Sequence, residues 1–494
     1  MMSENDTVRK FLTICEEYPQ NTAVYRAKNS INYSQLLQIT KAFAAVFTKN
    51  NFRKILIAAP AGEYAYAAMF ASLASDATYA PLNLLSSLEK KRRIVEIFKP
   101  DVIIGSQQEI EALCGESSVC ETLSIETIQN SVETYKDTEI RILPSSRPAY
   151  VIFTSGSTGL PKGVVIGRLA LDHYVGWMSE CLFITPQDRV SQYANIAFDL
   201  SVMEIYGGLC AGAALCPIET FFDRMRPARM IAAKQISVWI SVPSTITLMQ
   251  QSNELTFENL KTLKQFVFCG EALLVSQARM LRQTLPASDI FNTYGPTETT
   301  VSMTHIKVTD ALLQETSFPS VTLGNPISDM ALYLVGESPD DGEIVITGPQ
   351  LADGYLGNPE ATQAAFRDVQ TDKGPVLGYF TGDRGIRING KIYFAERFDF
   401  QIKHKGYRIE IEEIYGALGA IGYDKSCVLY MQQKIVVVIE TSQNPDVSFI
   451  RKELSKSLEP YAIPDIIINI DVFPRNENGK VDRKKIETAI EGRI

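Results

Sequence analysis

Residues 150–165, which read YVIFTSGSTGLPKGVV, combine glycines, hydroxyl side chains and a lysine in a pattern that suits a polyphosphate. Glycines let backbone N–H groups approach anionic oxygens, hydroxyls donate further hydrogen bonds, and a lysine supplies compact positive charge. The spacing does not fit a Walker loop, because Gly156 is followed five residues later by Pro161. A flexible surface turn is the alternative. The candidate phosphate contacts are Thr154, Ser155, Gly156, Ser157, Thr158, Gly159 and Lys162.

The string closely resembles the phosphate-binding signature of the acyl-adenylate-forming superfamily, which includes acyl-CoA synthetases, luciferases and adenylation domains of peptide synthetases. The superfamily's other segments follow in the same order, as NTYGPTETT (292–300), YFTGDRG (379–385), AERFDF (395–400) and NENGKVDRKK (476–485). The resemblance implies ATP and Mg2+ as cofactors and attack of a substrate carboxylate on the α-phosphorus. Such a reaction requires that two anions be neutralised and aligned, and it needs no covalent nucleophile.

The residue-wise match to the superfamily assigns roles in the nucleotide site. It places Tyr294 against the adenine, Glu298 on Mg2+, and the hydroxyl of Thr297 near the α-phosphate. Asp383 would accept both ribose hydroxyls, and Arg397 would be a second ribose or phosphate contact. The remaining members of this predicted nucleotide-binding set are Asn292, Thr293, Gly295 and Pro296.

The same match gives Lys480 the place of the lysine that bridges the substrate carboxylate and the α-phosphate. The alternative for this basic segment is a solvated face. With Thr154 and Glu298, Lys480 completes the predicted catalytic set. One departure weakens the assignment of the Arg397 turn, because the superfamily usually has glycine where this chain has Glu396.

Asp199, in FDLSVMEIY (198–206), lies where amino-acid-activating members have the carboxylate that pairs with the substrate's α-ammonium. A buried carboxylate without a partner is costly, so a cationic ligand would explain it. The structural alternative is a helix N-cap, with Ser201 and Glu204 in a staple-like turn. The rest of the predicted pocket is Leu200, Met203, Ser241, Val267, Cys269, Thr293, Val301 and Ser302.

Met203 and Cys269 are bulky enough to shorten this pocket, which favours a small side chain such as that of alanine, with glycine or serine as alternatives. FDLSVMEIY, FVFCGEA (266–272), NTYGPTE, FDFQIKHKGYRIEIEEI (398–414) and NGKVDRKK look like D-alanine:carrier protein ligases. In that family a cysteine at the place of Cys269 contributes to favouring the D-enantiomer. The implied partner is a separate phosphopantetheinylated carrier protein, since no carrier domain is expected after Lys480.

Other functions stay open beside this one. VPST at 242–245, Glu396 and a compact C-terminal domain leave room for a peptide-synthetase-like enzyme that loads L-alanine, glycine or serine. An acyl-CoA synthetase would have no ammonium for Asp199 to bind. A catalytically silent ATP-binding protein is the third alternative, and the presence of Thr154, Glu298, Asp383 and Lys480 argues against it.

The positioning elements are predicted from hydrophobic patterns. Apolar runs at 54–60, 101–105, 149–154 and 237–243 alternate with helical segments such as 88–98, which indicates an α/β fold with largely parallel strands. Short strands separated by turn residues from Thr322 onward predict a β-rich subdomain of this large N-terminal part. After Arg397 we expect a small, mobile α+β domain with one strand at 401–409, a helix at about 410–418, a strand KIVVVIET and a helix at 447–458.

The predicted domains are an adenylation core at 1–397, a hinge at 398–400 and a C-terminal lid at 401–494 that carries Lys480. The resemblance places Asp399 at the hinge and Gly406 in a tunnel for the thiol, because rotation of the lid would remove Lys480 after the first step. As the alternative, Asp399 is only a loop residue.

Charge and composition narrow the cellular context. The net charge of −9 over 494 residues gives no reason to expect nucleic acid or an anionic membrane as a partner. The N-terminal residues do not resemble a secretory signal and no apolar run spans a bilayer, so we expect a cytoplasmic protein. The 8 cysteines and 3 histidines show no metal-ligand spacing.

Overall fold

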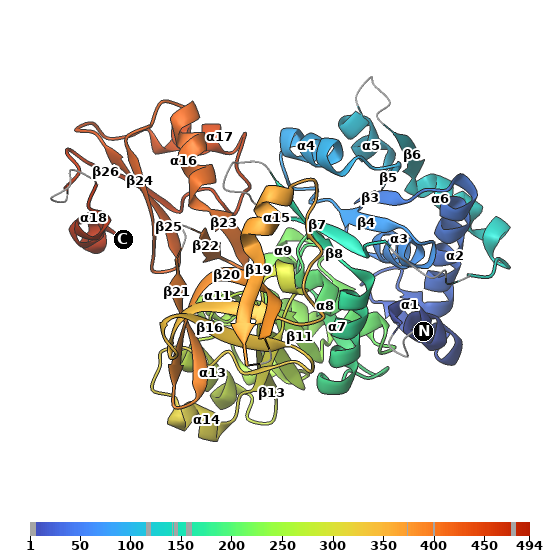
Figure 1. Ribbon diagram of the computed structural model, residues 1–494. Helices are drawn as coiled ribbons and strands as arrows, with labels where there is room; N and C mark the ends of the chain where they lie inside the picture. The colour runs from blue at the N-terminus through green and yellow to red at the C-terminus, as the bar shows by residue number, and fades with distance from the viewer. Residues whose placement is uncertain are drawn as a thin grey trace. The chain divides into compact units, whose positions relative to one another are not determined.

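The computed structural model describes residues 6–114, 120–140, 142, 147–154, 161–372, 374–398, 401–475 and 481–494 (Figure 1). The chain divides into two compact units. The first comprises Met1–Leu84, Val95–Phe153 and Gly163–Phe398, and the second comprises Leu85–Ile94, Thr154–Lys162 and Asp399–Ile494. The functional limits predicted from the sequence, with a hinge at 398–400, stay a prediction.

One sheet of seven strands is built mainly from the first third of the chain. Its order is β18 (Gly354–Tyr355), β8 (Lys162–Ile166), β7 (Tyr150–Thr154), β4 (Thr78–Pro81), β3 (Lys54–Ala58), β5 (Val102–Gly105) and β6 (Glu121–Ser124). Strand β4 runs parallel to β3 and β7, and β5 runs parallel to β3 and β6. Figure 1 shows helix α5 (Gln107–Cys114) on one side of these strands and α2 (Tyr33–Asn50) and α3 (Glu63–Ala74) on the other. Both faces are therefore covered, which explains the continuous apolar runs.

A second sheet has nine strands. Its order is β15 (Asn325–Pro326), β14 (Thr304–Lys307), β13 (Asp289–Tyr294), β12 (Gln265–Phe268), β11 (Val238–Ser241), β9 (Arg189–Gln192), β10 (Ala214–Pro217), β1 (Thr22–Val24) and β2 (Ile31–Asn32). The strands from β13 to β1 are parallel. Their carboxyl ends lie at one edge, where ligands of α/β proteins usually bind. The predicted pocket residues come from this edge.

The helices of the chain connect or flank these strands. In addition to α2, α3 and α5, those of residues 7–365 are α1 (Thr7–Glu17), α4 (Leu88–Phe98), α6 (Ile125–Tyr135), α7 (Arg168–Cys181), α8 (Leu200–Leu209), α9 (Phe221–Met225), α10 (Pro227–Lys234), α11 (Ser244–Gln251), α12 (Phe257–Leu260), α13 (Val275–Thr284), α14 (Asp310–Glu315) and α15 (Pro359–Ala365). Helix α4 has the bounds predicted from its apolar spacing.

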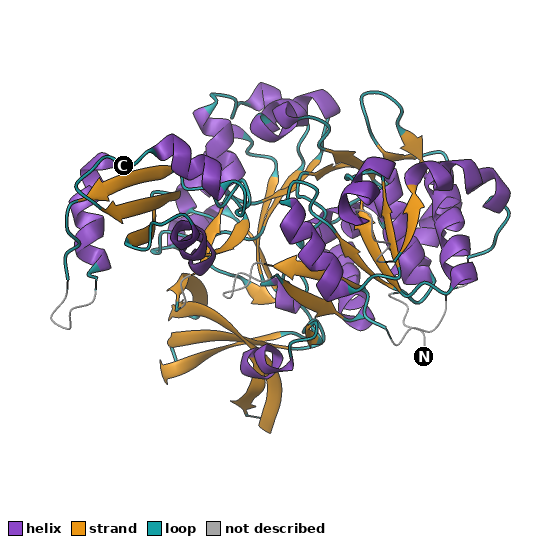
Figure 2. Ribbon diagram, turned by 90° about the horizontal axis from the view of Figure 1, so that it is seen from above, coloured by secondary structure: helices purple, strands orange, loops and turns teal. Residues whose placement is uncertain are grey.

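The predicted β-rich part is a five-stranded antiparallel sheet, which Figure 2 shows as a twisted group of strands with few helices around it. It consists of β16 (Ala331–Ser338), β17 (Asp341–Thr347), β19 (Phe366–Thr371), β20 (Gly374–Ile388) and β21 (Lys391–Arg397). Strand β21 pairs with β20 so that Arg397 lies opposite Asp383. The fold thereby brings two predicted nucleotide contacts together.

The second unit contains a small α+β fold, as predicted. A three-stranded sheet of β24 (Ser426–Met431), β25 (Lys434–Glu440) and β26 (Ile466–Ile470) is accompanied by α16 (Ile411–Ala420), α17 (Val447–Leu454) and α18 (Arg483–Ile490). Val437 of β25, Ile414 of α16 and Ile450 of α17 share one buried cluster. This local core shows how the apolar faces of these elements are satisfied.

Two expectations about the second unit are wrong in detail. The predicted single strand at 401–409 is a hairpin of β22 (Gln401–His404) and β23 (Tyr407–Glu410), because Lys405 and Gly406 turn the chain with φ of 52° and 82°. Helix α17 ends at Leu454 and not at Leu458. Tighter turns follow it, in which the Lys456 and Ser457 N–H groups donate to carbonyls three residues earlier.

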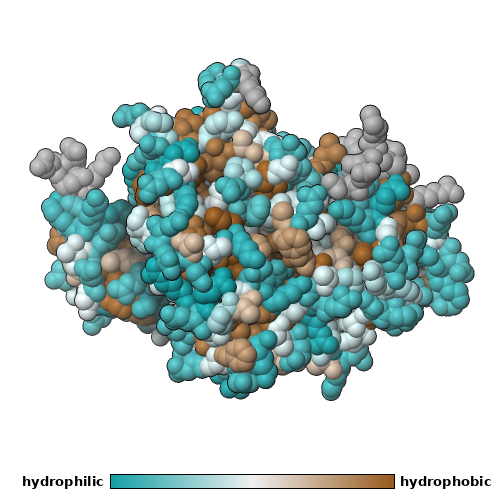
Figure 3. All heavy atoms as spheres, turned by 90° about the horizontal axis from the view of Figure 1, so that it is seen from below, coloured by the Kyte–Doolittle hydropathy of each residue, from teal (hydrophilic) through white to brown (hydrophobic). Residues whose placement is uncertain are grey.

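Within the described ranges, no helix has the length and apolarity needed to cross a membrane. On the face drawn in Figure 3, hydrophobic atoms form small patches among hydrophilic ones. Phe221, Leu169 and Val472 are among the most exposed large apolar side chains, and they come from separate parts of the chain. Scattered exposure of this kind is usual for globular proteins.

The buried carboxylate of Glu254, which follows α11, links this helix to the start of α10. Glu254, which is 4% exposed, accepts a hydrogen bond from Arg226 Nε at 2.8 Å and also pairs with Arg229. The Arg226 hydrogen bond is the main reason why the pKa of Glu254 is lowered to about 2. Because the pKa in the folded protein is below its unfolded value, the ionised carboxylate stabilises the fold.

We expect Glu254→Gln to lower stability at pH 7 by roughly 1–3 kcal/mol. The difference in unfolding free energy between the variant and the unmodified protein should be largest above the unfolded pKa of about 4.3. It should decrease as the pH falls toward about 2. Urea midpoints measured from pH 7 to pH 3 test this. Glu258→Gln is the control, because its carboxylate is exposed and pairs only at the surface with Lys261. A gap that does not narrow on acidification would contradict the assignment.

Candidate active site

Asp199 faces the predicted nucleotide segment. It precedes α8 with φ −60° and ψ −32°, and its side chain makes no capping hydrogen bond. Instead, Thr297 Oγ1 donates to Asp199 Oδ2 at 2.7 Å. The N-cap alternative is therefore wrong, because the helical backbone at Asp199 differs from the extended conformation of a typical cap. The hydroxyl of Thr297, predicted near the α-phosphate, is engaged by this carboxylate.

Glu204 holds the loop that precedes Asp199. Its fully buried carboxylate accepts the N–H groups of Tyr193 at 2.6 Å and Ala194 at 3.1 Å, at the end of β9. Burial raises its pKa well above the usual range for a glutamate. The predicted staple-like turn is wrong, and Glu204 is a loop anchor that sequence reasoning missed. The available signal was a single acidic residue inside the otherwise apolar helix LSVMEIYGGL.

The predicted pocket residues gather at the carboxyl ends of β11, β12 and β13 and on α8. Ser241 Oγ hydrogen-bonds Thr245 Oγ1 at 2.8 Å, and Ser302 Oγ hydrogen-bonds Tyr174 OH at 3.0 Å. Tyr174 was not predicted. The buried members of the set are Met203, Ser241, Val267, Cys269, Thr293, Val301 and Ser302, whereas Leu200 is partly exposed. Polar side chains, those of Ser241, Thr293 and Ser302, therefore lie among the apolar members of this set.

The turn after Tyr294 is tightly constrained. A Cβ on Gly295 would lie 2.6 Å from Ser302 Cα, so only glycine fits there. Thr300 and Val301 have φ of 57° and 71°, which is unfavourable for β-branched residues. The Cys269 thiol lies 3.6 Å from the Val301 carbonyl and donates to it. Such strain is found mainly at functional sites, where the surrounding structure maintains it.

The predicted ribose contacts form a buried hydrogen-bonded group. Tyr294 OH donates to Asp383 Oδ2 at 2.7 Å, and the Arg397 guanidinium pairs with Asp383 Oδ1. Arg397 also donates to the Thr381 carbonyl at 3.1 Å. Burial, followed by the charge of Asp383, raises the pKa of Tyr294 well above its usual value. The structure therefore joins Tyr294 and Arg397, two of the predicted nucleotide contacts, at the carboxylate of a third, Asp383.

The predicted metal ligand Glu298 is 1% exposed and accepts the Tyr355 hydroxyl at 2.8 Å. The described residues hold no cluster of three or more potential metal ligands. The Glu298 carboxylate is a hard oxygen ligand of the kind that Mg2+ prefers, and Mg2+ typically takes only one or two carboxylates from a protein. Asn292 and Thr293 hold the neighbouring strand, since their side chains donate to the carbonyls of Thr322 and Phe268.

Other predicted residues belong to the second unit or lie outside the described residues. Thr154 Oγ1 lies 3.5 Å from the Lys162 carbonyl within the second unit. Gly406 occupies the turn between β22 and β23. The predicted residues outside the described ranges are Ser155, Gly156, Ser157, Thr158, Gly159, Asp399 and Lys480.

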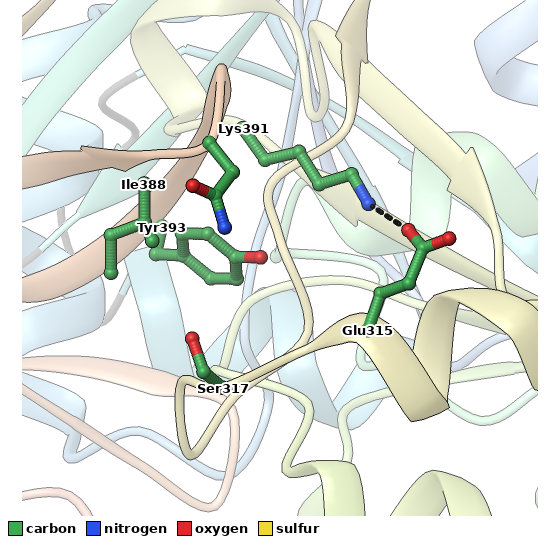
Figure 4. Close-up of a pocket in the computed structure, with 6 residues that line it drawn as sticks. Glu315, Ser317, Ile388, Lys391 and Tyr393 are labelled. Carbon is green, nitrogen blue, oxygen red and sulfur yellow. Dashed lines mark hydrogen bonds and ion pairs between the residues drawn. The ribbon is translucent and has the colours of Figure 1, made fainter.

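A separate polar pocket of about 400 Å³ lies between the end of α14 and the turn joining β20 to β21. Residues that line it are drawn in Figure 4. Lys391 Nζ and Glu315 Oε2 form an ion pair across it at 2.9 Å. None of its lining residues belongs to the predicted site, and of the ion-paired side chains Glu315 is exposed and Lys391 is partly exposed. The other lining residues are Ser317, Ile388, Asn389 and Tyr393.

Known proteins share both this sequence pattern and this fold. A family model described as AMP-binding enzyme matches residues 11–356. The D-alanine--D-alanyl carrier protein ligase of Listeria monocytogenes serotype 4a (strain HCC23) is 31% identical, over 96% of this chain and 97% of the relative. The Staphylococcus aureus (strain JH9) protein of that name is 30% identical, over 99% of this chain and 100% of its own. The adenylation domain AlmE of Vibrio cholerae, solved with glycyl-adenosine-5'-phosphate, has a TM-score of 0.86 at 24% identity, covering 100% of this chain and 99% of that chain.

We expect Asp383→Asn to weaken the fold and nucleotide binding together. The substitution leaves the nearly buried Arg397 guanidinium without its charge partner, at a cost of roughly 3 kcal/mol. Thermal unfolding with and without ATP measures both effects. Asp341→Asn is the matched control, because it breaks a more exposed pair with Arg384 in the same sheet. Equal losses in the two variants would contradict a special role for Asp383.

Proposed function

Because the chain belongs to the family of AMP-binding enzymes, we propose that it activates a small amino acid, D-alanine first among them, as the aminoacyl-adenylate. It then passes the aminoacyl group to the phosphopantetheine thiol of a separate carrier protein. The observation that carries the proposal is the place of Asp199, whose carboxylate meets Thr297 in the nucleotide segment. The names of the Listeria and Staphylococcus relatives support the same substrate and partner.

In the first half-reaction a carboxylate oxygen of the amino acid attacks the α-phosphorus of ATP. The bond from that phosphorus to the bridging oxygen breaks, and pyrophosphate leaves. Asp199 pairs with the α-ammonium and so directs the substrate carboxylate toward the nucleotide. Lys480 bridges the two reacting anions. A magnesium ion bound by Glu298 would neutralise charge on the phosphates.

The nucleotide is held by the group around Asp383. Its carboxylate accepts the ribose hydroxyls while Arg397 and Tyr294 keep it in place. The Tyr294 ring, anchored by its own hydroxyl, offers a face to the adenine. The glycine and hydroxyl loop at 154–159, with Lys162, binds the phosphates.

In the second half-reaction the carrier thiol loses its proton and attacks the carbonyl carbon of the adenylate. A thioester forms and AMP departs. Lys480 leaves the site when residues 401–494 rotate about the hinge at Asp399, and Gly406 then lines the thiol's path. We place this reaction in the cytoplasm, where ATP is available.

A second candidate uses another small amino acid. AlmE, which shares the fold, is solved with glycyl-adenosine-5'-phosphate, so glycine is a specific competitor to alanine. Serine and L-alanine are also small enough for a pocket bounded by Met203 and Cys269. An acyl-CoA synthetase remains disfavoured, because its substrate has no ammonium for Asp199.

Amino-acid-dependent ATP–pyrophosphate exchange tests the proposal. We expect exchange with D-alanine above that with L-alanine, glycine and serine, and none with a fatty acid. Lys480→Ala should reduce it at least about a hundredfold, because a charge that stabilises the transition state is removed. Lys484→Ala is the control for loss of a nearby positive charge. Exchange with glycine alone would support the second candidate, and silence with every amino acid would refute both.

Cys269→Ala tests the basis of enantiomer preference. Loss of the thiol frees the Val301 carbonyl and adds space beside it, so the ratio of D-alanine to L-alanine exchange should fall roughly tenfold. The control is Cys216→Ala, which removes another buried thiol from the same sheet. An unchanged ratio in Cys269→Ala would show that other residues select the enantiomer.

A further inference from the structure

Residues 352–356, which follow β17, contact the predicted metal ligand Glu298 and strand β8. The Ala352 N–H donates to the Glu298 carbonyl at 2.8 Å, and the Asp353 N–H donates to the Val165 carbonyl at 2.8 Å. Gly354 and Tyr355, which form β18, then pair with Val165 and Val164 of β8. The segment therefore connects the turn that carries Glu298 to the strand that follows the predicted phosphate loop.

The close approach of this segment to β8 depends on Gly163. The Leu356 N–H donates to the Gly163 carbonyl at 2.8 Å. A Cβ on Gly163 would lie 2.9 Å from Val151 Cγ1 and 3.2 Å from Leu356 Cβ. A side chain at position 163 would therefore require Val151 and Leu356 to shift, and Leu356 directly follows Tyr355 in the chain. The glycine of the phosphate-loop motif thus allows the close packing beside β18.

Tyr355 is held from several sides. Its N–H donates to Thr362 Oγ1 at 2.9 Å, and its ring meets Phe366 edge to face with centroids 6.1 Å apart. The side chain is buried and its hydroxyl donates to Glu298 Oε1 at 2.8 Å. A ring fixed in this way fixes the direction of the hydrogen bond it gives.

We propose that Tyr355 is a positioning residue that orients the Glu298 carboxylate toward the magnesium ion of the bound nucleotide. The proposal rests on the proposed function, which makes Glu298 the metal ligand. Outer hydrogen-bond partners of metal-binding carboxylates typically change metal affinity by 10- to 100-fold. A hydroxyl also suits this role. It donates a hydrogen bond to the buried Glu298 oxygen and leaves the negative charge of the carboxylate available to the cation, whereas an arginine would neutralise that charge.

The test compares nucleotide binding with and without magnesium. For Tyr355→Phe, we expect the Mg2+ concentration that half-saturates ATP binding in calorimetry to rise roughly tenfold. ATP affinity in EDTA should not change, and the ligand-free thermal midpoint should change no more than in the control. That control is Tyr33→Phe, which removes a buried hydroxyl that donates to the Ala213 carbonyl at 2.7 Å.

The outcomes separate this inference from the function on which it rests. An unchanged Mg2+ requirement in Tyr355→Phe, while Glu298→Gln raises it, overturns the role of Tyr355 and leaves the metal ligand intact. An equal loss of ATP affinity with and without Mg2+ in Tyr355→Phe also overturns the positioning role, because it would show that the Tyr355 hydroxyl only supports the structure of the site. If Glu298→Gln leaves the Mg2+ requirement unchanged, both the metal assignment and this inference fail.

Discussion

The hydrogen bond from Thr297 to Asp199 links the two halves of the site. This hydrogen bond holds the Asp199 carboxylate beside Thr297. Glu298, which follows Thr297 in the chain, accepts a hydrogen bond from Tyr355. In the proposed function, two neighbouring residues of one short turn thus act toward two different ligands. Binding an amino group and a polyphosphate side by side would then require that this turn keep its geometry. The surrounding elements act to keep it.

The geometry of this turn strains the backbone. Thr300 and Val301 adopt left-handed conformations that β-branched residues avoid, and Gly295 admits no side chain. Hydrogen bonds compensate for the strain. The Thr300 hydroxyl donates to the Gln350 carbonyl at 2.8 Å, and the Cys269 thiol donates to the Val301 carbonyl. Cys269, a predicted pocket residue, therefore supports the turn through its contact with Val301.

The local hydrophobic pattern was enough to predict those elements in which the order of apolar and polar residues reflects which faces are buried. The helical spacing of α4 gave its correct bounds, and the apolar runs at 54–60 and 149–154 located β3 and β7 to within two residues, because burial leaves a pattern in the sequence. The hairpin around Gly406 was missed although the sequence carries a signal for it. Gly406 is a turn residue, and the apolar positions change phase between Ile402 and the pair Tyr407 and Ile409. Motif resemblance placed Tyr294, Asp383 and Arg397, and the structure joins them. Contacts between distant residues leave no such trace, so the pairing of Tyr355 with Glu298, 57 residues apart, could not be predicted. For the loop anchor Glu204 the sequence offered only its position as a single acidic residue in an apolar helix.

The residues proposed to bind the amino acid and the group around Asp383 belong to the first unit, whereas Thr154, Lys162 and Gly406 belong to the second. The central claim is that both serve transfer to a carrier thiol. Intact-mass spectrometry of a phosphopantetheinylated carrier incubated with the enzyme, ATP and D-alanine tests it most directly. The account predicts a gain of one alanyl group on the modified carrier and none on the carrier without its prosthetic arm. Adenylate formation with an unchanged carrier mass, or thioester formation on free coenzyme A instead, would contradict it.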